Sequence, residues 1–281
     1  MAETSGGTGA TERVADVLLL FTDGPPTLGV TRVARELGLS KAVVHRILQS
    51  LTGRGLIAYD PVSREYRLGP AAAALGGRAL RDSDLRSAAL PHLVDLRDRL
   101  GETATVSAKV HGGRVYLDQV VGTHEITMSV EIGRRFPLHA GSSGKCMLAF
   151  ASPDEIDAVL SGALPSLTAA TLTEPDVLHA ELDRIRERGY AASAGERQAD
   201  AGSVAAPVFG PSGDVIGAVS VCGPRFRVTD EFVTATAPEV VAAAGRVSAR
   251  LADRAHARPA RTAPRTPART HAAPAAAGRT S

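Results

Sequence analysis

Residues 30–51, VTRVARELGLSKAVVHRILQSL, decide the fold of the N-terminal part of the chain. Apolar side chains recur at helical spacing over residues 30–37, which predicts a helix that ends at Gly38. Ser40 is a typical N-cap for the helix that follows, and that helix has an apolar stripe made of Val44, Ile47, Leu48 and Leu51. Two short helices joined by a glycine-containing turn predict a helix-turn-helix.

The flanking segments extend this motif. Residues 14–21 have apolar side chains at helical spacing, and the helix that they predict stops at the DGPP sequence of residues 23–26. On the other side, residues 56–59 and 65–68 flank the turn-forming sequence DPVSR (60–64), which predicts a β-hairpin. The order helix, helix, turn, helix, hairpin is that of a winged helix-turn-helix, in which the third helix enters the major groove of DNA.

The polar face of the third predicted helix has side chains suited to DNA. Lys41, His45 and Gln49 follow one another at intervals of four residues, with Arg46 beside them, and base edges and phosphates require such donors and amides. A polar face is also typical of any solvent-exposed helix, so this pattern alone leaves both interpretations open. The residues that we expect to contact DNA are Thr31, Ser40, Lys41, Ala42, His45, Arg46, Gln49 and, on the hairpin, Arg64.

The remainder of the chain predicts a second, α+β domain. Alternating apolar and polar residues predict hairpins around the glycine-containing turns at residues 111–114 and 210–214, and helical patterns surround them. The predicted strands cover 103–110, 115–121, 204–209 and 215–221, and the predicted helices cover 85–100, 144–151, 153–160, 175–188 and 230–253. A sheet covered by helices is typical of an α+β fold.

These patterns divide the chain into five parts. We expect a disordered N-terminus (1–10), a winged helix-turn-helix domain (11–69), a linker helix (70–82), an α+β domain (83–253) and a disordered tail rich in Arg, Pro and Ala (254–281). The net charge is +2 over residues 1–80, −5 over 81–254 and +5 over 255–281. Basic ends would suit a polyanion, although a solubilising tail is the favoured alternative for the last segment.

Composition excludes several protein classes. The chain has 281 residues, of which 44% are hydrophobic and 22% are charged, as in globular proteins with room for two domains. No apolar run approaches the roughly 18 residues of a membrane span, and the first residues lack the features of a signal peptide, so we expect a cytoplasmic protein without membrane contact. Two cysteines cannot build a disulfide framework or a cysteine-rich zinc site, and we expect no metal or cofactor.

The loop AGSSGK (140–145) precedes the apolar helix predicted at 146–150. Small residues at a helix N-terminus let backbone N–H groups approach an anion, so this loop predicts a cradle for a carboxylate or phosphate, unless the residues only cap the helix. It is not a Walker A loop, because His139 and Cys146 occupy positions that such a loop requires to be Gly and Ser or Thr. It also lacks the Gly-x-Ser-x-Gly order of a nucleophile elbow.

At this level of detail the sequence resembles the IclR family of transcriptional regulators. The resemblance lies in RVARELGLSKAVVHRILQSL (32–51), GLI (55–57) and YRLG (66–69), and then in PLHAGSSGKCMLA (137–149) and AAPVF (205–209). It covers about residues 10–253 and follows the family's order in both domains. It implies a winged helix-turn-helix joined by a linker helix to a GAF-like α+β effector-binding domain.

The resemblance also implies an effector pocket. The family positions that line it correspond here to Ser142, Ser143, Ser203, Ser220 and Cys222, and Ser193 stands where relatives often have an acidic residue, with Glu196 as the nearest carboxylate. Residues 220 and 222 share one face of their strand. Hydroxyls and backbone amides suit a small carboxylate or an amino-acid-like effector.

We therefore expect a ligand-responsive regulator, a repressor rather than an activator, that binds a pseudo-palindromic double-stranded DNA operator as a homodimer or homotetramer. An alternative from another class is a small-molecule enzyme or sensor without DNA binding, in which Cys146 or Cys222 would be activated by His139 or His124. Because Cys146 has Met147 and Leu148 beside it, we expect it to pack in the core, and we predict no catalytic residue. A partner-recruiting adaptor is a further alternative.

Overall fold

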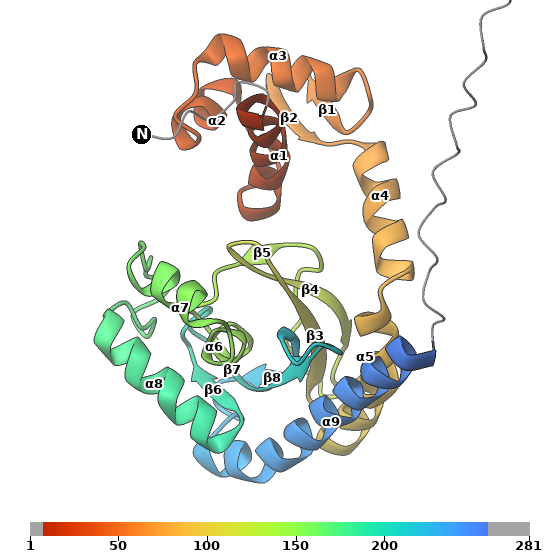
Figure 1. Cartoon of the computed structure of the whole chain (residues 1–281), viewed down its shortest axis with the longest axis vertical. Helices are drawn as coiled ribbons and strands as arrows, with labels where there is room; N and C mark the ends of the chain where they lie inside the picture. Colours follow the sequence, from red (N-terminus) through yellow and green to blue (C-terminus); the bar gives the residue numbers. More distant parts are fainter. Residues whose placement is uncertain (1–7, 258–281) are drawn as a thin grey trace, which may run out of the picture.

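The computed structural model describes residues 8–257, which form an N-terminal domain, a helical connection and a larger sheet-containing domain (Figure 1). Two predicted boundaries are wrong. Helix α1 (Thr8–Asp23) begins before residue 11, and helix α9 (Asp230–Ala257) continues beyond residue 253. Extending a formed helix adds one hydrogen bond per residue, so terminal turns form without apolar contacts of their own. The disorder predicted for residues 1–7 and for the tail from residue 258 lies outside the described residues.

The N-terminal domain has the predicted winged helix-turn-helix order. After α1 come α2 (Val30–Glu36), α3 (Lys41–Thr52) and a hairpin of β1 (Ile57–Asp60) and β2 (Glu65–Leu68). Gly38 adopts a positive φ of 63° in the turn between α2 and α3, and Ser40 caps α3 by accepting a hydrogen bond from the Val43 N–H at 3.3 Å. Leu28 and Tyr66 exchange two backbone hydrogen bonds, which attach the hairpin to the helices.

The domain core forms where the apolar faces of these elements meet. The buried side chains come from all three helices, from both strands and from the segment between α1 and α2: Val17, Phe21, Leu28, Val33, Ala34, Val44, Leu48, Leu51, Ile57 and Tyr66. Within α3 the buried positions follow helical spacing, so burying one side of the helix leaves the opposite side in solvent.

A single helix, α4 (Pro70–Arg81), connects this domain to the second one (Figure 1). Pro70 occupies its first turn, as predicted. None of the twelve residues of α4 is buried, although the helix has four consecutive alanines and Leu75, which is 64% exposed. The helix therefore has an apolar surface that the described residues, 8–257, do not cover.

The second domain contains a six-stranded antiparallel sheet in the order β5-β4-β3-β8-β7-β6. The strands are β3 (Thr103–Val110), β4 (Gly113–Val120), β5 (Arg135–Phe136), β6 (Ala191–Ala194), β7 (Ala201–Phe209) and β8 (Val215–Pro224). Strands β5 and β6 were not predicted, because they are short and have little alternation of their own. Their backbone groups complete the two edges of a sheet whose inner strands the sequence does predict.

Helices cover both faces of the sheet. Helices α5 (Asp84–Leu100) and α9 pack on one face, where Leu93, Val106, Val219 and Val247 are buried together. The other face is covered by α6 (Ser142–Ala149), α7 (Pro153–Leu160) and α8 (Pro175–Arg188). Helix α6 begins at Ser142, before the predicted start at residue 144, because Gly141 turns the chain into it with a positive φ of 81°.

Candidate DNA-binding and effector sites

Helix α3 lies on the side of the N-terminal domain remote from the large sheet (Figure 1). Its predicted DNA-contacting side chains Lys41, Ala42, His45, Arg46 and Gln49 are all exposed. Ser40 is also exposed, but its hydroxyl oxygen already caps the helix, and Thr31 is exposed in the first turn of α2. The fold therefore leaves the polar side of α3 open to a macromolecule.

Two grooves flank α3 and separate the predicted contacts into two groups. Arg46 lines an apolar groove of about 300 Å³ together with Arg13 and Val14 of α1. His45 and Gln49 line the opposite groove, which Tyr59 and Tyr66 of the hairpin complete. The sequence analysis did not include Arg13 among the DNA-contacting residues, because only the packing of α1 beside α3 brings Arg13 near Arg46.

The hairpin tip is held by a local hydrogen-bond network. The Asp60 carboxylate accepts hydrogen bonds from the Val62 N–H and the Ser63 hydroxyl, both at 2.9 Å, and these bonds lower the pKa of Asp60 below its ordinary value. Arg64 follows with φ 57°, in the left-handed region, and its side chain is exposed. A cation at this tip is placed to contact a phosphate beside the groove that α3 would enter.

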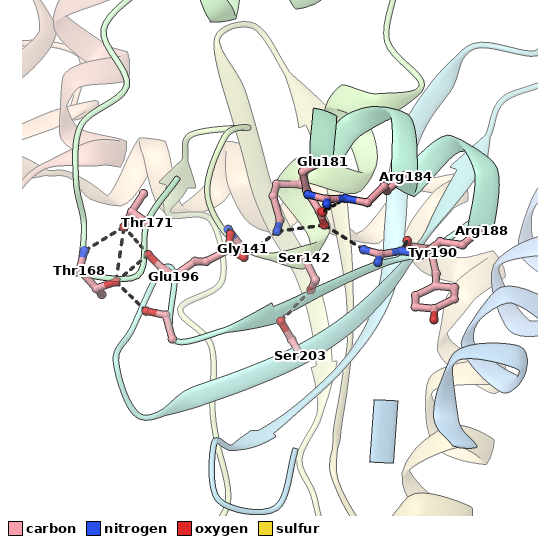
Figure 2. A network of polar contacts seen from close by, with 12 residues as sticks. Gly141, Ser142, Thr168, Thr171, Glu181, Arg184, Arg188, Tyr190, Glu196 and Ser203 are labelled. Carbon is pink, nitrogen blue, oxygen red and sulfur yellow. Dashed lines mark hydrogen bonds and ion pairs between the residues drawn. The ribbon is translucent and has the colours of Figure 1, made fainter. Parts of the chain in front are cut away.

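The second domain contains a small cavity where α6 begins above β7 and β8. Five of the six predicted effector residues line it, namely Ser142, Ser143, Ser193, Ser203 and Cys222. The cavity has a volume of about 20 Å³, and the hydroxyl groups of Ser142 and Ser203 lie 2.7 Å apart across it (Figure 2). The structure thus gathers residues that are separated by up to 80 positions in the chain.

Ser220 does not reach this cavity. Its hydroxyl group is buried and forms a 2.7 Å hydrogen bond with the hydroxyl of Thr105 on the paired strand β3. Ser220 and Cys222 do share a face of β8, as predicted, but two residues along a strand are about 7 Å apart. Sharing a face therefore did not place both side chains at one cavity.

The predicted anion cradle at the start of α6 already binds a carboxylate of the chain itself. Glu196 accepts hydrogen bonds from the Gly141 N–H at 3.0 Å and from Lys145 Nζ at 2.6 Å. Thr168 and Thr171 bind the Glu196 carbonyl group from the other side (Figure 2). The sequence analysis expected the backbone N–H groups of this loop to receive a ligand's carboxylate, but the Gly141 N–H is already bonded to the internal carboxylate of Glu196, which also compensates the buried Lys145.

Sequence reasoning missed two arginines at the same cavity. Arg114 of β4 is 1% exposed, and its guanidinium lies 4.5 Å from the ring centroid of Tyr116 and 5.4 Å from that of Phe136. Arg197 contacts the same aromatic pair, with its guanidinium 4.7 Å from the Phe136 centroid and 5.8 Å from that of Tyr116. Both arginines line the cavity. Arg114 lies two residues before Tyr116 on one strand, and that spacing was the available signal.

The two domains meet beside this cavity. Arg135 of β5 forms a two-pronged ion pair with Asp23 at the end of α1, with Nε 2.7 Å from Oδ1 and Nη2 bonded to Oδ2. An open pocket of about 540 Å³ lies at this junction and shares Arg197 and Gln198 with the smaller cavity. A continuous set of contacts therefore connects the cavity wall to the N-terminal domain.

The cysteines lack the surroundings of an activated thiol. Burial raises the pKa of Cys222 to about 12 and raises the pKa of Cys146 far above its ordinary value. His139 Nε2 interacts with the Pro165 carbonyl oxygen at 3.0 Å rather than with either thiol. Within residues 8–257, no cluster of three or more His, Cys, Asp or Glu residues is placed to hold a metal ion, and no helix is long and apolar enough to cross a membrane.

Two family models match the chain in the order of its domains. The IclR helix-turn-helix domain matches residues 10–61, and the bacterial transcriptional regulator IclR C-terminal domain matches residues 77–249. The HTH-type transcriptional regulator BhcR of Paracoccus denitrificans is 35% identical over 255 residues, which are 90% of this chain and 91% of BhcR.

Solved structures agree with this assignment. An IclR transcriptional regulator from Silicibacter sp. TM1040 has a TM-score of 0.77 at 30% identity, over 87% of this chain and 96% of that one. An IclR homolog from Microbacterium hydrocarbonoxydans, solved in complex with 4-hydroxybenzoate, has a TM-score of 0.64 at 27% identity, over 86% of this chain and 98% of the homolog. These relatives are regulators rather than enzymes, as we predicted for this chain. With its winged domain, its exposed α3 and its matching sensor domain, the chain belongs to the IclR family of DNA-binding transcriptional regulators.

Proposed function

We propose that this protein is a repressor that binds a pseudo-palindromic operator and responds to a small organic acid. The observation that carries the proposal is the exposed polar side of α3, which presents Lys41, His45, Arg46 and Gln49 to solvent on a winged domain. Gln49 can read a base edge with its amide, whereas the cations bind phosphates or guanine. Thr31, Ser40, Ala42 and Arg64 complete the proposed contact surface.

The operator is bound by a homodimer or by a pair of dimers. One winged domain reads only a short half-site, so two copies related by a twofold axis are needed for a longer palindrome. The uncovered apolar surface of α4 supports this assembly, because a second copy packed along α4 would remove Leu75 and its alanine neighbours from water. The same contact would hold the two DNA-binding domains at a defined spacing.

The effector binds at the cavity beneath the start of α6. Ser142, Ser143, Ser193, Ser203 and Cys222 provide hydroxyl groups and a thiol there, and the structure of the homolog with 4-hydroxybenzoate supports an organic acid as the ligand class. Because the cavity volume is only about 20 Å³, which is room for about one water molecule, the ligand must push the wall outward.

That movement would reach DNA through strand β5. Phe136 contacts the cavity arginines, and the adjacent residue Arg135 is paired with Asp23 of α1. A ligand changes the DNA-binding equilibrium only if it binds one domain arrangement more tightly than the other, and about 1.4 kcal/mol of difference changes DNA affinity tenfold. The effector is expected to favour the arrangement that does not fit the operator.

A gel-shift titration with the intergenic DNA beside the protein's own gene tests the DNA proposal. Arg46→Ala should weaken operator binding by about tenfold or more and reduce the salt dependence between about 50 and 200 mM, because one phosphate or base contact is lost. Arg184→Ala, which removes an exposed cation of α8, is the matched control. Equal affinity of Arg46→Ala and the wild type would contradict the placement of DNA on α3.

A further inference from the structure

The effector cavity contains two cations that no carboxylate within residues 8–257 pairs with. Arg114 donates one hydrogen bond, from Nη2 to the Tyr116 hydroxyl at 3.2 Å, while its Nε and Nη1 have no partner among the described residues. Arg197 forms neither an ion pair nor a hydrogen bond with any side chain or backbone group in residues 8–257. Both guanidinium groups lie near Cys222, whose thiol pKa they lower against the larger effect of burial.

The other buried cation of the domain makes the contrast clear. Lys145 is 2% exposed and is bonded to the Glu196 carboxylate, with Glu181 as a second carboxylate 3.6 Å away. Burying an unpaired charge destabilises the folded state by several kcal/mol. The cation–π contacts of Arg114 with its aromatic neighbours stabilise the charge by only about 0.5–2 kcal/mol each. Arg114 therefore needs an anion that the described part of the chain does not provide.

The positions of the two arginines indicate where the anionic groups of a ligand would lie. Arg114 is buried at the inner wall, on β4, whereas Arg197 is half-buried in the loop that follows β6 and also lines the open pocket at the domain junction. A ligand entering from that pocket passes Arg197 first and meets Arg114 last. The hydroxyl groups of Ser142, Ser143 and Ser203 lie along the same wall and can accept or donate hydrogen bonds.

We propose that the effector is a small dicarboxylate, with one carboxylate bound by Arg114 at the inner end of the cavity and the other bound by Arg197 at its mouth. The proposal rests on the effector site assigned above and names its ligand class. Guanidinium N–H groups form strong charge-assisted hydrogen bonds with carboxylates, and the Nε and Nη1 of Arg114 have no partner among the described residues. One carboxylate would leave the second guanidinium uncompensated, whereas two carboxylates balance both charges.

Calorimetric titration of the full chain tests the proposal, with malonate, succinate, glutarate and adipate as probes. Each is compared with the monocarboxylate of the same chain length at constant ionic strength and about pH 7.5, where all carboxyl groups are ionised. At least one dicarboxylate should bind about tenfold or more tightly than its monocarboxylate partner. Absence of dicarboxylate binding, or equal affinity for the two members of every pair, would overturn the proposal.

Three variants separate the roles of the arginines. Arg114→Met keeps the volume and removes the charge, and it should weaken dicarboxylate binding by at least about tenfold. Arg197→Gln should remove the preference for two carboxylates while monocarboxylate binding persists. Arg184→Gln, at an exposed site on α8, should bind as the wild type does. Unchanged dicarboxylate affinity in Arg114→Met would contradict the assignment.

A substitute variant and an operator-binding assay serve as controls for these titrations. If Arg114→Met does not fold, Arg114→Lys retains a cation but loses the planar pair of donors, so dicarboxylate binding should still weaken. Each variant is also tested for operator binding without any acid present. Retained operator binding together with absent acid binding would refute the dicarboxylate alone, whereas a wild-type chain that fails to bind operator DNA would refute the proposed function.

Discussion

The cations of α3 and those of the sensor domain have opposite surroundings. Lys41 and Arg46 are exposed, so water solvates them and they cost the fold little. Arg114 and Lys145 are 1% and 2% exposed. Burying each charge costs several kcal/mol of hydration free energy, which interactions within the protein or with a ligand must offset. The difference teaches that the proposed DNA surface is stable without a partner, whereas the proposed effector cavity contains a buried cation that no carboxylate within residues 8–257 pairs with.

The largest expected effect concerns the compensated cation. Glu196→Gln leaves Lys145 buried with only Glu181, at 3.6 Å, and should lower the free energy of unfolding of the sensor domain by about 3 kcal/mol. Urea denaturation followed by circular dichroism measures the change. Glu131→Gln, which breaks the exposed pair with Arg134, is the control and should cost less than about 1 kcal/mol. Similar losses in the two variants would remove the distinction between buried and exposed cations.

A smaller effect is expected where the exposed helix is held in place. Ser40→Ala removes the acceptor for the Val43 N–H and should destabilise the start of α3 by about 1 kcal/mol. Amide hydrogen exchange at Val43 reports this loss directly, and Ser40→Thr retains the hydroxyl as a control. If exchange at Val43 is as slow in Ser40→Ala as in the wild type, the cap does not stabilise the helix that we propose to contact DNA.

The smallest effect is expected at the thiol beside Arg114. Burial holds the pKa of Cys222 at about 12, so the thiol is neutral at about pH 8, where an ordinary thiol is partly ionised. Iodoacetamide should therefore leave Cys222 of the folded chain unlabelled at that pH, and label it in urea, as peptide mass spectrometry would show. Rapid labelling of the native chain would mean that the cavity opens to solvent without a ligand.

The N-terminal domain could be predicted from the sequence almost element by element. Its helices begin and end at local signals, such as Ser40 and Gly38, and of its two hairpin strands the second matches the prediction while the first is shifted by one residue. The outer helices α7 and α8 likewise begin at Pro153 and Pro175, as predicted. These signals act within a few residues along the chain, so a single sequence contains them in full.

The effector site was only partly predictable. The resemblance to the IclR family identified five residues that line the cavity, but it also included Ser220, whose hydroxyl bonds Thr105 instead. Sequence reasoning treated the loop before α6 as open to a ligand's carboxylate, although Glu196, 55 residues from Gly141, binds there. It missed Arg114, because it placed this residue in the turn at 111–114, whereas β4 begins at Gly113 and Arg114 is buried within the strand.

The sequence by itself determined the fold class, the family and the polar side of α3, because helical periodicity, caps and turn residues are local properties of the chain. Only the tertiary structure decided which charges meet: Lys145 with Glu196, Asp23 with Arg135, and Arg114 with aromatic rings but with no carboxylate of residues 8–257. Those outcomes depend on strands and loops that are distant in sequence and adjacent in space. Burial and charge compensation are therefore properties of the packed molecule, and they set the chemistry of its ligand.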